Sequence, residues 1–325
     1  MSTESEFELI TRLAPFLAMG GDDVVVGHGD DAAVIDLDGR GVCLAVDVLV
    51  DEVHFRRDLS SMADVGFKAV AVNCSDMAAM GAAPSVAVVG LCRPASLPAD
   101  DIEELYAGMH EACGRWGLRL VGGDTVASGA LAISVTVLGD IDPARAVRRS
   151  GARPSDRLLI VGTLGGPAAA LAQVEAGVEV DEGLLALHRR PEAQVEAGRT
   201  LAELGATAMI DVSDGLGADL GHLCTASSVG AVVSAAALPV AEGVIAAAVA
   251  LGRDPHELIV GGGDDYALLA AVPADKAEQA VAATGGVLVG EIVSGEVSVT
   301  LQMPDGSTRD MMGLGWDHYR NRTGG

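Results

Sequence analysis

Short apolar runs bounded by glycine and aspartate recur along this chain, and they constrain its fold more than any other feature of the sequence. In the first half, Val24 to Val26, Ala32 to Ile35 and Val42 to Val50 are typical of β-strands that end at turns. The stretches from Ser61 to Gly81 and from Ala99 to Trp116 carry apolar residues at helical spacing, and Ser61 is a suitable N-cap. Strands that alternate with helices in this way predict a mixed fold, α/β or α+β.

A change of composition near residues 143–154 indicates two domains. Four arginines gather there, and a new apolar run, Leu158 to Gly162, follows them. Farther on, the strand-like run Met209 to Val212 leads into Ser213-Asp-Gly-Leu216 and a helical stretch, which is an α/β pattern. We therefore expect one domain over residues 1–145 and an α/β domain over residues 146–325.

The composition excludes several classes of function. The chain has 325 residues, of which 50% are hydrophobic, and this is typical of a compact globular protein. A net charge of −25 repels phosphate backbones, and 3% aromatic residues offer few rings for stacked bases, so we expect no nucleic-acid partner. The chain starts with acidic residues and has no apolar run near the roughly 18 residues that span a bilayer. We therefore expect no membrane association and a cytoplasmic location.

Cysteine and lysine are informative because of their small numbers. Five scattered cysteines form no Cys-x-x-Cys motif, so we expect free thiols rather than disulfides or a zinc site. Lys68 and Lys276 are the only lysines, and neither follows a glycine-rich loop. A Walker A motif and the strand lysine of protein kinases are both excluded.

Several aspartates lie where a predicted strand ends or a turn begins, which is where binding sites are often built. Asp76 lies instead in the predicted helix, three residues after Asn73 and on the same face. Taken singly, such an aspartate is most often a turn former or a helix cap. The residues at strand ends and turns are Asp30, Asp31, Asp47, Asp124, Asp211 and Asp214.

As a set, these carboxylates favour a metal site. If they converge in a partly desolvated place, they cannot all stay ionised without cations between them. Hard oxygen ligands of this kind select Mg²⁺, which completes its coordination with water and phosphate oxygens. This hypothesis explains how an acidic protein without a phosphate-binding lysine can bind a nucleotide polyphosphate such as ATP.

Seven motifs, in this order, resemble those of the thiamine-monophosphate kinase family, within the aminoimidazole ribonucleotide synthetase superfamily. The resemblance covers nearly the whole chain, and the closing Gly315-Trp-Asp-His-Tyr319 also favours this family. The motifs are Gly29-Asp-Asp-Ala-Ala-Val34, Asp47-Val-Leu-Val-Asp-Glu-Val-His-Phe55, Asn73-Cys-Ser-Asp-Met-Ala-Ala-Met-Gly81, Gly122-Gly-Asp124, Arg149-Ser-Gly151, Asp211-Val-Ser-Asp-Gly-Leu216 and Gly262-Gly-Asp-Asp-Tyr266.

The resemblance implies an N-terminal domain that pairs with its copy to form a barrel at a homodimer interface, and a C-terminal domain that completes the active site. It implies transfer of the ATP γ-phosphoryl group to thiamine monophosphate, with several Mg²⁺ ions. The implied metal ligands are Asp30, Asp47, Asp76, Asp124, Asp211 and, as a further candidate, Asp214. The implied ATP contacts are Tyr106, Gly123, Asp124, Arg149 and Ser213, and the implied substrate contacts are His54, Asp264 and Trp316.

Two alternatives stay open at this stage. Ala45 and Val46 stand where the family usually carries hydroxyl residues, and Asp264 and Ala267 stand where it commonly has glutamates. These departures are compatible with an ATP-dependent enzyme of the same superfamily that acts on a different small substrate. They are also compatible with a non-catalytic nucleotide-binding protein whose site has decayed. His54 and Trp316 have simpler interpretations too, as a core histidine and an anchor for the chain end.

Overall fold

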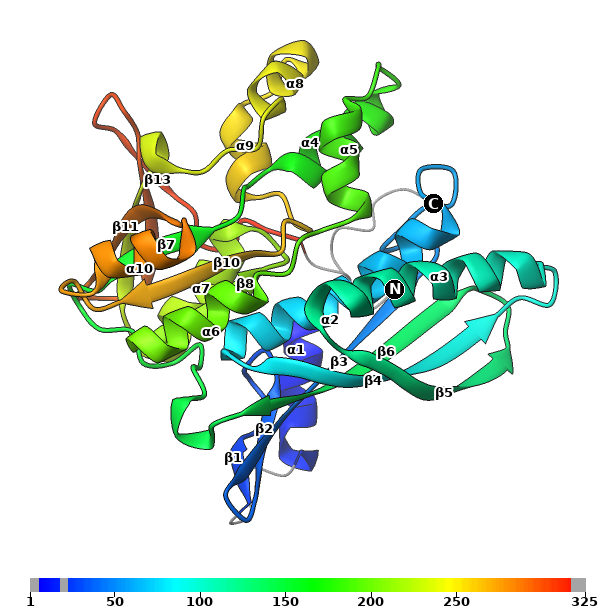
Figure 1. Ribbon diagram of the computed structural model, residues 1–325. Helices are drawn as coiled ribbons and strands as arrows, with labels where there is room; N and C mark the ends of the chain where they lie inside the picture. Colours follow the sequence, from blue (N-terminus) through cyan, green and yellow to red (C-terminus); the bar gives the residue numbers. More distant parts are fainter. Residues whose placement is uncertain (1–5, 18–22, 317–325) are drawn as a thin grey trace.

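Two domains, each built on one β-sheet, form the structure (Figure 1). The computed structural model describes residues 6–17 and 23–316. The first sheet has six strands in the order β1-β2-β3-β6-β4-β5, and the second has seven in the order β13-β12-β9-β11-β7-β10-β8. The predicted mixed α/β fold with two domains is confirmed.

The N-terminal elements alternate between strands and helices, as the apolar runs predict. The strands are β1 (Val24–Val26), β2 (Ala33–Leu37), β3 (Arg40–Val50), β4 (Ala83–Arg93), β5 (Arg119–Ala127) and β6 (Ala132–Ile141). The helices are α1 (Glu6–Leu13), α2 (Met62–Met80) and α3 (Ala99–Trp116), with 3-10 turns η1 (Ala14–Phe16) and η2 (Pro143–Arg145).

The C-terminal elements form a largely antiparallel sheet with helices around it, in which only β12 and β9 pair in parallel among the described strands. The strands are β7 (Arg157–Val161), β8 (Ala208–Val212), β9 (Gly230–Ser234), β10 (Ala267–Val272), β11 (Val287–Val293), β12 (Ser298–Gln302) and β13 (Thr308–Asp310). The helices are α4 (Gly166–Ala176), α5 (Glu182–Arg189), α6 (Val195–Leu204), α7 (Leu216–Ser227), α8 (Val244–Leu251), α9 (Pro255–Val260) and α10 (Ala277–Thr284), with the 3-10 turn η3 (Ala235–Ala237).

Helix α2 begins and ends as its sequence predicts. The Ser61 hydroxyl accepts a hydrogen bond from the backbone N–H of Asp64, whose carboxylate accepts one from the N–H of Ser61. Gly81 ends the helix with φ of 74°, a left-handed conformation that glycine adopts without strain. Met77 and Met80 of this helix are fully buried in the core.

Helix α2 lies at the junction of the two domains, because it contacts β3 and β6 on one side and β8 and α6 on another. Glycines allow neighbouring helices to approach it closely. A Cβ atom at Gly108 of α3 would lie 1.9 Å from the Ala63 carbonyl oxygen, and one at Gly198 of α6 would lie 2.1 Å from that of Ala78. Residues on α2 therefore have fixed positions relative to both sheets.

Strands β4 and β5 differ from the sequence-based prediction. Gly122-Gly-Asp124 was expected to form a turn, but it lies inside β5. Pairing with β4 decides this, since tertiary contacts can override the low strand propensity of glycine and aspartate. A Cβ atom at Gly123 would lie 2.0 Å from the Val89 carbonyl oxygen, so glycine permits the close approach of the two strands.

Neither sheet closes into a barrel in the described part of the chain, and the first sheet ends at β1 and β5. The predicted barrel needs a second copy and stays a prediction, as does the domain boundary at residue 145. Across residues 6–17 and 23–316, no helix is both long enough and apolar enough to cross a bilayer.

Candidate active site

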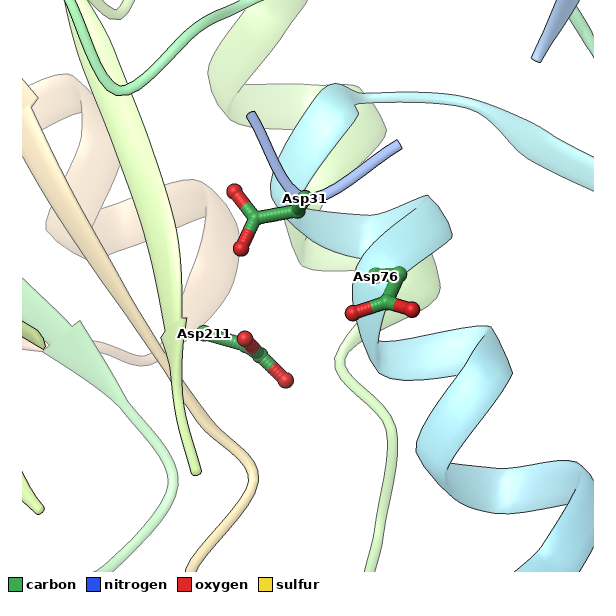
Figure 2. A group of neighbouring side chains, drawn as sticks. All are labelled: Asp31, Asp76 and Asp211. Atoms are coloured by element: carbon green, nitrogen blue, oxygen red, sulfur yellow. The ribbon is translucent and has the colours of Figure 1, made fainter. Parts of the chain in front are cut away.

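Three carboxylates from distant parts of the sequence converge between the two domains (Figure 2). Asp31 lies in the bend before β2, Asp76 in α2 and Asp211 in β8. One oxygen atom from each can be chosen so that all three lie within 4.8 Å of one another. We call these residues the carboxylate cluster.

The carboxylate cluster is electrostatically strained. Burial, and then repulsion from Asp47, Asp211 and Asp31, raise the pKa of Asp76 well above its usual range. Burial and the nearby Asp31 charge raise the pKa of Asp211 to about 8, although Ser75 Oγ donates to Asp211 Oδ2 at 2.6 Å and opposes this shift. Without a cation, the carboxyl groups of Asp76 and Asp211 therefore tend to retain protons near neutral pH.

Arg149 neutralises part of the negative charge of the carboxylate cluster. Its guanidinium lies 2.8 Å from Asp31 Oδ1, and the Asp31 side chain is 1% exposed. Asp31 Oδ2 is buried and has no hydrogen-bond partner in the described chain. A buried carboxylate oxygen without a donor, beside two further carboxylates, fits a hard divalent cation such as Mg²⁺.

Two predicted ligands border the carboxylate cluster. Asp47 lies inside β3, not at a strand end, and its backbone N–H donates to Asn73 Oδ1 at 3.1 Å. Burial raises the Asp47 pKa to about 6, while a hydrogen bond with the Asp76 side chain opposes the rise. The Asp30 carboxylate accepts a hydrogen bond from the Arg149 backbone N–H at 2.6 Å, and its neighbour Asp31, not Asp30, belongs to the cluster.

Asp124 and Asp214 lie outside the group of three in the described part of the chain. Asp124 is exposed on β5, where its carboxylate accepts a bond from the Thr125 N–H. Asp214 follows β8 and donates its backbone N–H to the Asp219 carboxylate at 3.1 Å. Burial, and then repulsion from Asp214, raise the pKa of Asp219, so acidic groups continue beyond the cluster.

The predicted ATP contacts occupy two regions. Arg149 and Ser213 lie near the carboxylate cluster, the first by its ion pair with Asp31 and the second two residues after Asp211. Gly123 lies on the exposed strand β5. Tyr106 on α3 packs against the N-terminal core, and burial raises its pKa.

Each of the three predicted substrate contacts has polar partners in the structure. Trp316 donates its backbone N–H to the Asp214 carbonyl oxygen at 2.9 Å, and the residue is 43% exposed. His54 lies in the turn after β3 and accepts the Val50 N–H on Nδ1 at 3.0 Å. Asp264 is ion-paired to Lys68 and His188, with distances of 2.6 and 2.5 Å.

Sequence reasoning missed Lys68 and His188, which the structure brings to this region, and it placed Asp31 in the carboxylate set without selecting it as a metal ligand. Asp31 is the second acid of Gly29-Asp-Asp31 and could have been chosen with Asp30. Lys68 interrupts the apolar run Val65-Gly-Phe-Lys-Ala-Val70, and a charge inside such a run is a signal of a buried ion pair. His188 has no comparable signal, because only the packing of α5 places it beside Asp264.

Comparison with known proteins gives consistent matches over most of the chain. Residues 29–141 match the N-terminal domain of AIR synthase related proteins, and residues 153–302 match the C-terminal domain of the same proteins. A thiamine-monophosphate kinase of Mycobacterium tuberculosis is 45% identical over 267 residues, which are 82% of this chain and 80% of the relative. That of Escherichia coli K12 is 32% identical over 334 residues, covering 97% and 98% of the two chains. The solved structure of AaThiL complexed with AMPPCP and TMP superposes with a TM-score of 0.85 at 31% identity, and 97% of each chain is covered.

Proposed function

This chain belongs to the thiamine-monophosphate kinase family of AIR synthase related proteins, and we propose on this premise that it phosphorylates thiamine monophosphate with ATP. The γ-phosphoryl group passes to an oxygen of the substrate phosphate, and the products are thiamine diphosphate and ADP. The observation that carries the proposal is the carboxylate cluster at the domain junction. The similarity of the whole chain to a solved structure complexed with AMPPCP and TMP supports it.

The chain's own residues position the reactants. The acceptor phosphate oxygen is already ionised near neutral pH, so no protein nucleophile is needed, and alignment and charge compensation determine the rate. Arg149 is a candidate for a phosphate contact because its guanidinium is held beside Asp31. Ser213, with a backbone carbonyl bonded to the Asp264 N–H at 2.7 Å, is a candidate to orient the nucleotide.

We propose that Asp31, Asp76 and Asp211 hold Mg²⁺, with Asp30, Asp47 and Asp214 as neighbouring ligands. The unpartnered Asp31 Oδ2 and the raised pKa values of Asp76 and Asp211 support this assignment. When bound, the metal would neutralise phosphate charge beside these carboxylates. Asp124 on β5 is a more distant candidate for a metal or nucleotide contact.

A homodimer is part of the proposal. Residues of β3 alternate, so that Ala45 and Leu49 are buried toward α2 while Val46 and Val48 are 59% and 49% exposed on the other face. Val88 of β4 and Val121 and Val126 of β5 are exposed as well. A second copy that covers this apolar face would form the expected barrel and would bring the exposed Gly123 and Asp124 to the interface.

A cytoplasmic location accords with these features, because ATP is available there and the described cysteines are free. The chain also keeps its buried, mutually repelling carboxylates, which does not favour a decayed, non-catalytic site.

An ADP-release assay tests the proposed function. Purified protein with ATP and Mg²⁺ is expected to release ADP with thiamine monophosphate and not with thiamine or with unrelated phosphate monoesters. The Asp211→Asn variant serves as the matched control for contaminating kinases. A preference for another acceptor would refute the substrate assignment, and ATP binding without acceptor-dependent ADP release would identify a binding protein.

A further inference from the structure

Lys68 is a buried ammonium group at the junction of the two domains. Its side chain is 3% exposed, although lysine is rarely buried without a partner. Nζ donates to Asp264 Oδ2 at 2.6 Å and to the His54 carbonyl oxygen at 3.2 Å. The three residues belong to α2, to the loop before β10 and to the turn after β3. One side chain thus links segments of both domains.

His188 of α5 completes the contacts of Asp264. Its Nδ1 atom lies 2.5 Å from Asp264 Oδ2, and its side chain is 6% exposed. Burial pushes the Asp264 pKa upward, but the charges and hydrogen bonds of Lys68 and His188 outweigh it and lower the pKa to about 2. An ionised carboxylate can only accept, so His188 Nδ1 carries a hydrogen and donates it. Lys68 Nζ and His188 Nδ1 lie 3.4 Å apart. They are therefore two donors that share one acceptor, Asp264 Oδ2.

The backbone of Asp264 is held as firmly as its side chain. Its φ is +73°, in the left-handed region that non-glycine residues seldom occupy. Its N–H donates to the Ser213 carbonyl oxygen at 2.7 Å, next to the carboxylate cluster. A backbone conformation of this kind costs free energy, and it persists only where surrounding contacts hold the residue in place. The position of the Asp264 carboxylate is thus set from the C-terminal domain by Ser213 and His188, and from the N-terminal domain by Lys68.

We infer that Lys68 is a positioning residue for thiamine monophosphate. This inference rests on the proposed function, and on His54 and Asp264 as the substrate contacts that the family resemblance implies; these two residues lie in opposite domains. The ammonium group keeps these two segments in one arrangement, because it is bonded to both. It also offsets the Asp264 charge, which would otherwise repel the phosphate of the substrate in an already acidic site. ATP is proposed to bind at Arg149 and Ser213, whereas the Lys68 ammonium is bonded to His54 and Asp264, so we expect ATP binding to depend much less on Lys68.

Steady-state kinetics with each substrate varied in turn test the inference. For Lys68→Met, we expect the KM for thiamine monophosphate to rise about tenfold or more, and the KM for ATP to stay within about twofold. Lys276→Met is the matched control, since Lys276 is the only other lysine and lies before α10. Its two KM values are expected to remain those of the wild type. An unchanged KM for thiamine monophosphate in folded Lys68→Met would overturn the inference.

A pair of His188 variants decides the question even if Lys68→Met does not fold. His188→Asn can keep an N–H donor near the position of Nδ1, whereas His188→Leu removes it. We expect a wild-type KM for thiamine monophosphate in the asparagine variant and a raised one in the leucine variant. If the leucine variant lost only thermal stability and kept its KM, the contacts would be structural and the inference wrong. A wild-type protein without acceptor-dependent ADP release would instead refute the proposed function itself, and with it this inference.

Discussion

Replacing Asp211 with asparagine should stabilise the metal-free protein while weakening its response to Mg²⁺. Asp211 is 4% exposed, and its pKa is about 8 in the folded chain against 3.8 in its ordinary state. Between these values the folded state binds more protons than the unfolded state, so stability falls as pH rises from about 4 to about 8. Asparagine cannot ionise, and its side-chain oxygen can still accept the bond from Ser75 Oγ.

The size of the effect follows from this linkage. The difference between pH 7 and 3.8, at about 1.4 kcal/mol per pH unit, gives an upper limit of about 4 kcal/mol for the cost of Asp211 at pH 7. Asp31, Asp47 and Asp76 still repel one another in the variant, so we expect a gain of about 1–3 kcal/mol in the free energy of unfolding. The gain should vanish near pH 4, where the carboxyl group is protonated in both states.

Urea denaturation in the presence of a chelator, followed by circular dichroism at pH 4, 5.5 and 7, measures this gain. Repeating the series with excess Mg²⁺ should stabilise the wild type more than Asp211→Asn, because a metal ligand has been lost. Asp275→Asn, at an exposed position before α10, is the control and should change neither series. Equal stability of Asp211→Asn and the wild type at every pH would refute the argument that the carboxylate cluster is strained.

Three further predictions test the site, the assembly and the packing. Asp76→Asn should fold normally but lose acceptor-dependent ADP release by about 100-fold or more, as judged by circular dichroism and the coupled assay, since it removes a proposed ligand rather than core packing. Val46→Glu should convert a dimer to monomers in sedimentation velocity, whereas Val249→Glu, at a 75% exposed position on α8, should leave the assembly unchanged. Gly198→Ala should destabilise the protein by about 1–3 kcal/mol in thermal or urea unfolding because its Cβ would meet the Ala78 carbonyl, while Gly114→Ala, where nothing lies within 4 Å, should be neutral or slightly stabilising.

Local signals in the sequence predicted the elements that have strong periodicity and clear ends. Helix α2 begins at the capping box of Ser61 and ends at Gly81, as expected from residue types alone. Strand β5 was not predicted, since Gly122, Gly123 and Asp124 are turn formers, and only their pairing with β4 makes them a strand. Propensity failed there because the partner strand is about 30 residues away in the sequence.

The sequence by itself excluded a Walker A lysine and predicted that a set of acidic side chains with Mg²⁺ takes its place, because residue types and their motifs carry that information. It also identified Asp31, Asp76 and Asp211 as members of the set. Only the tertiary structure decided that Asp31 rather than Asp30 lies with Asp76 and Asp211, that Asp124 lies on an exposed strand, and that Lys68 and His188 hold Asp264. The reason is physical: burial and separations of a few ångströms govern charge interactions, and both depend on how α2 packs between two sheets whose residues lie far apart along the chain.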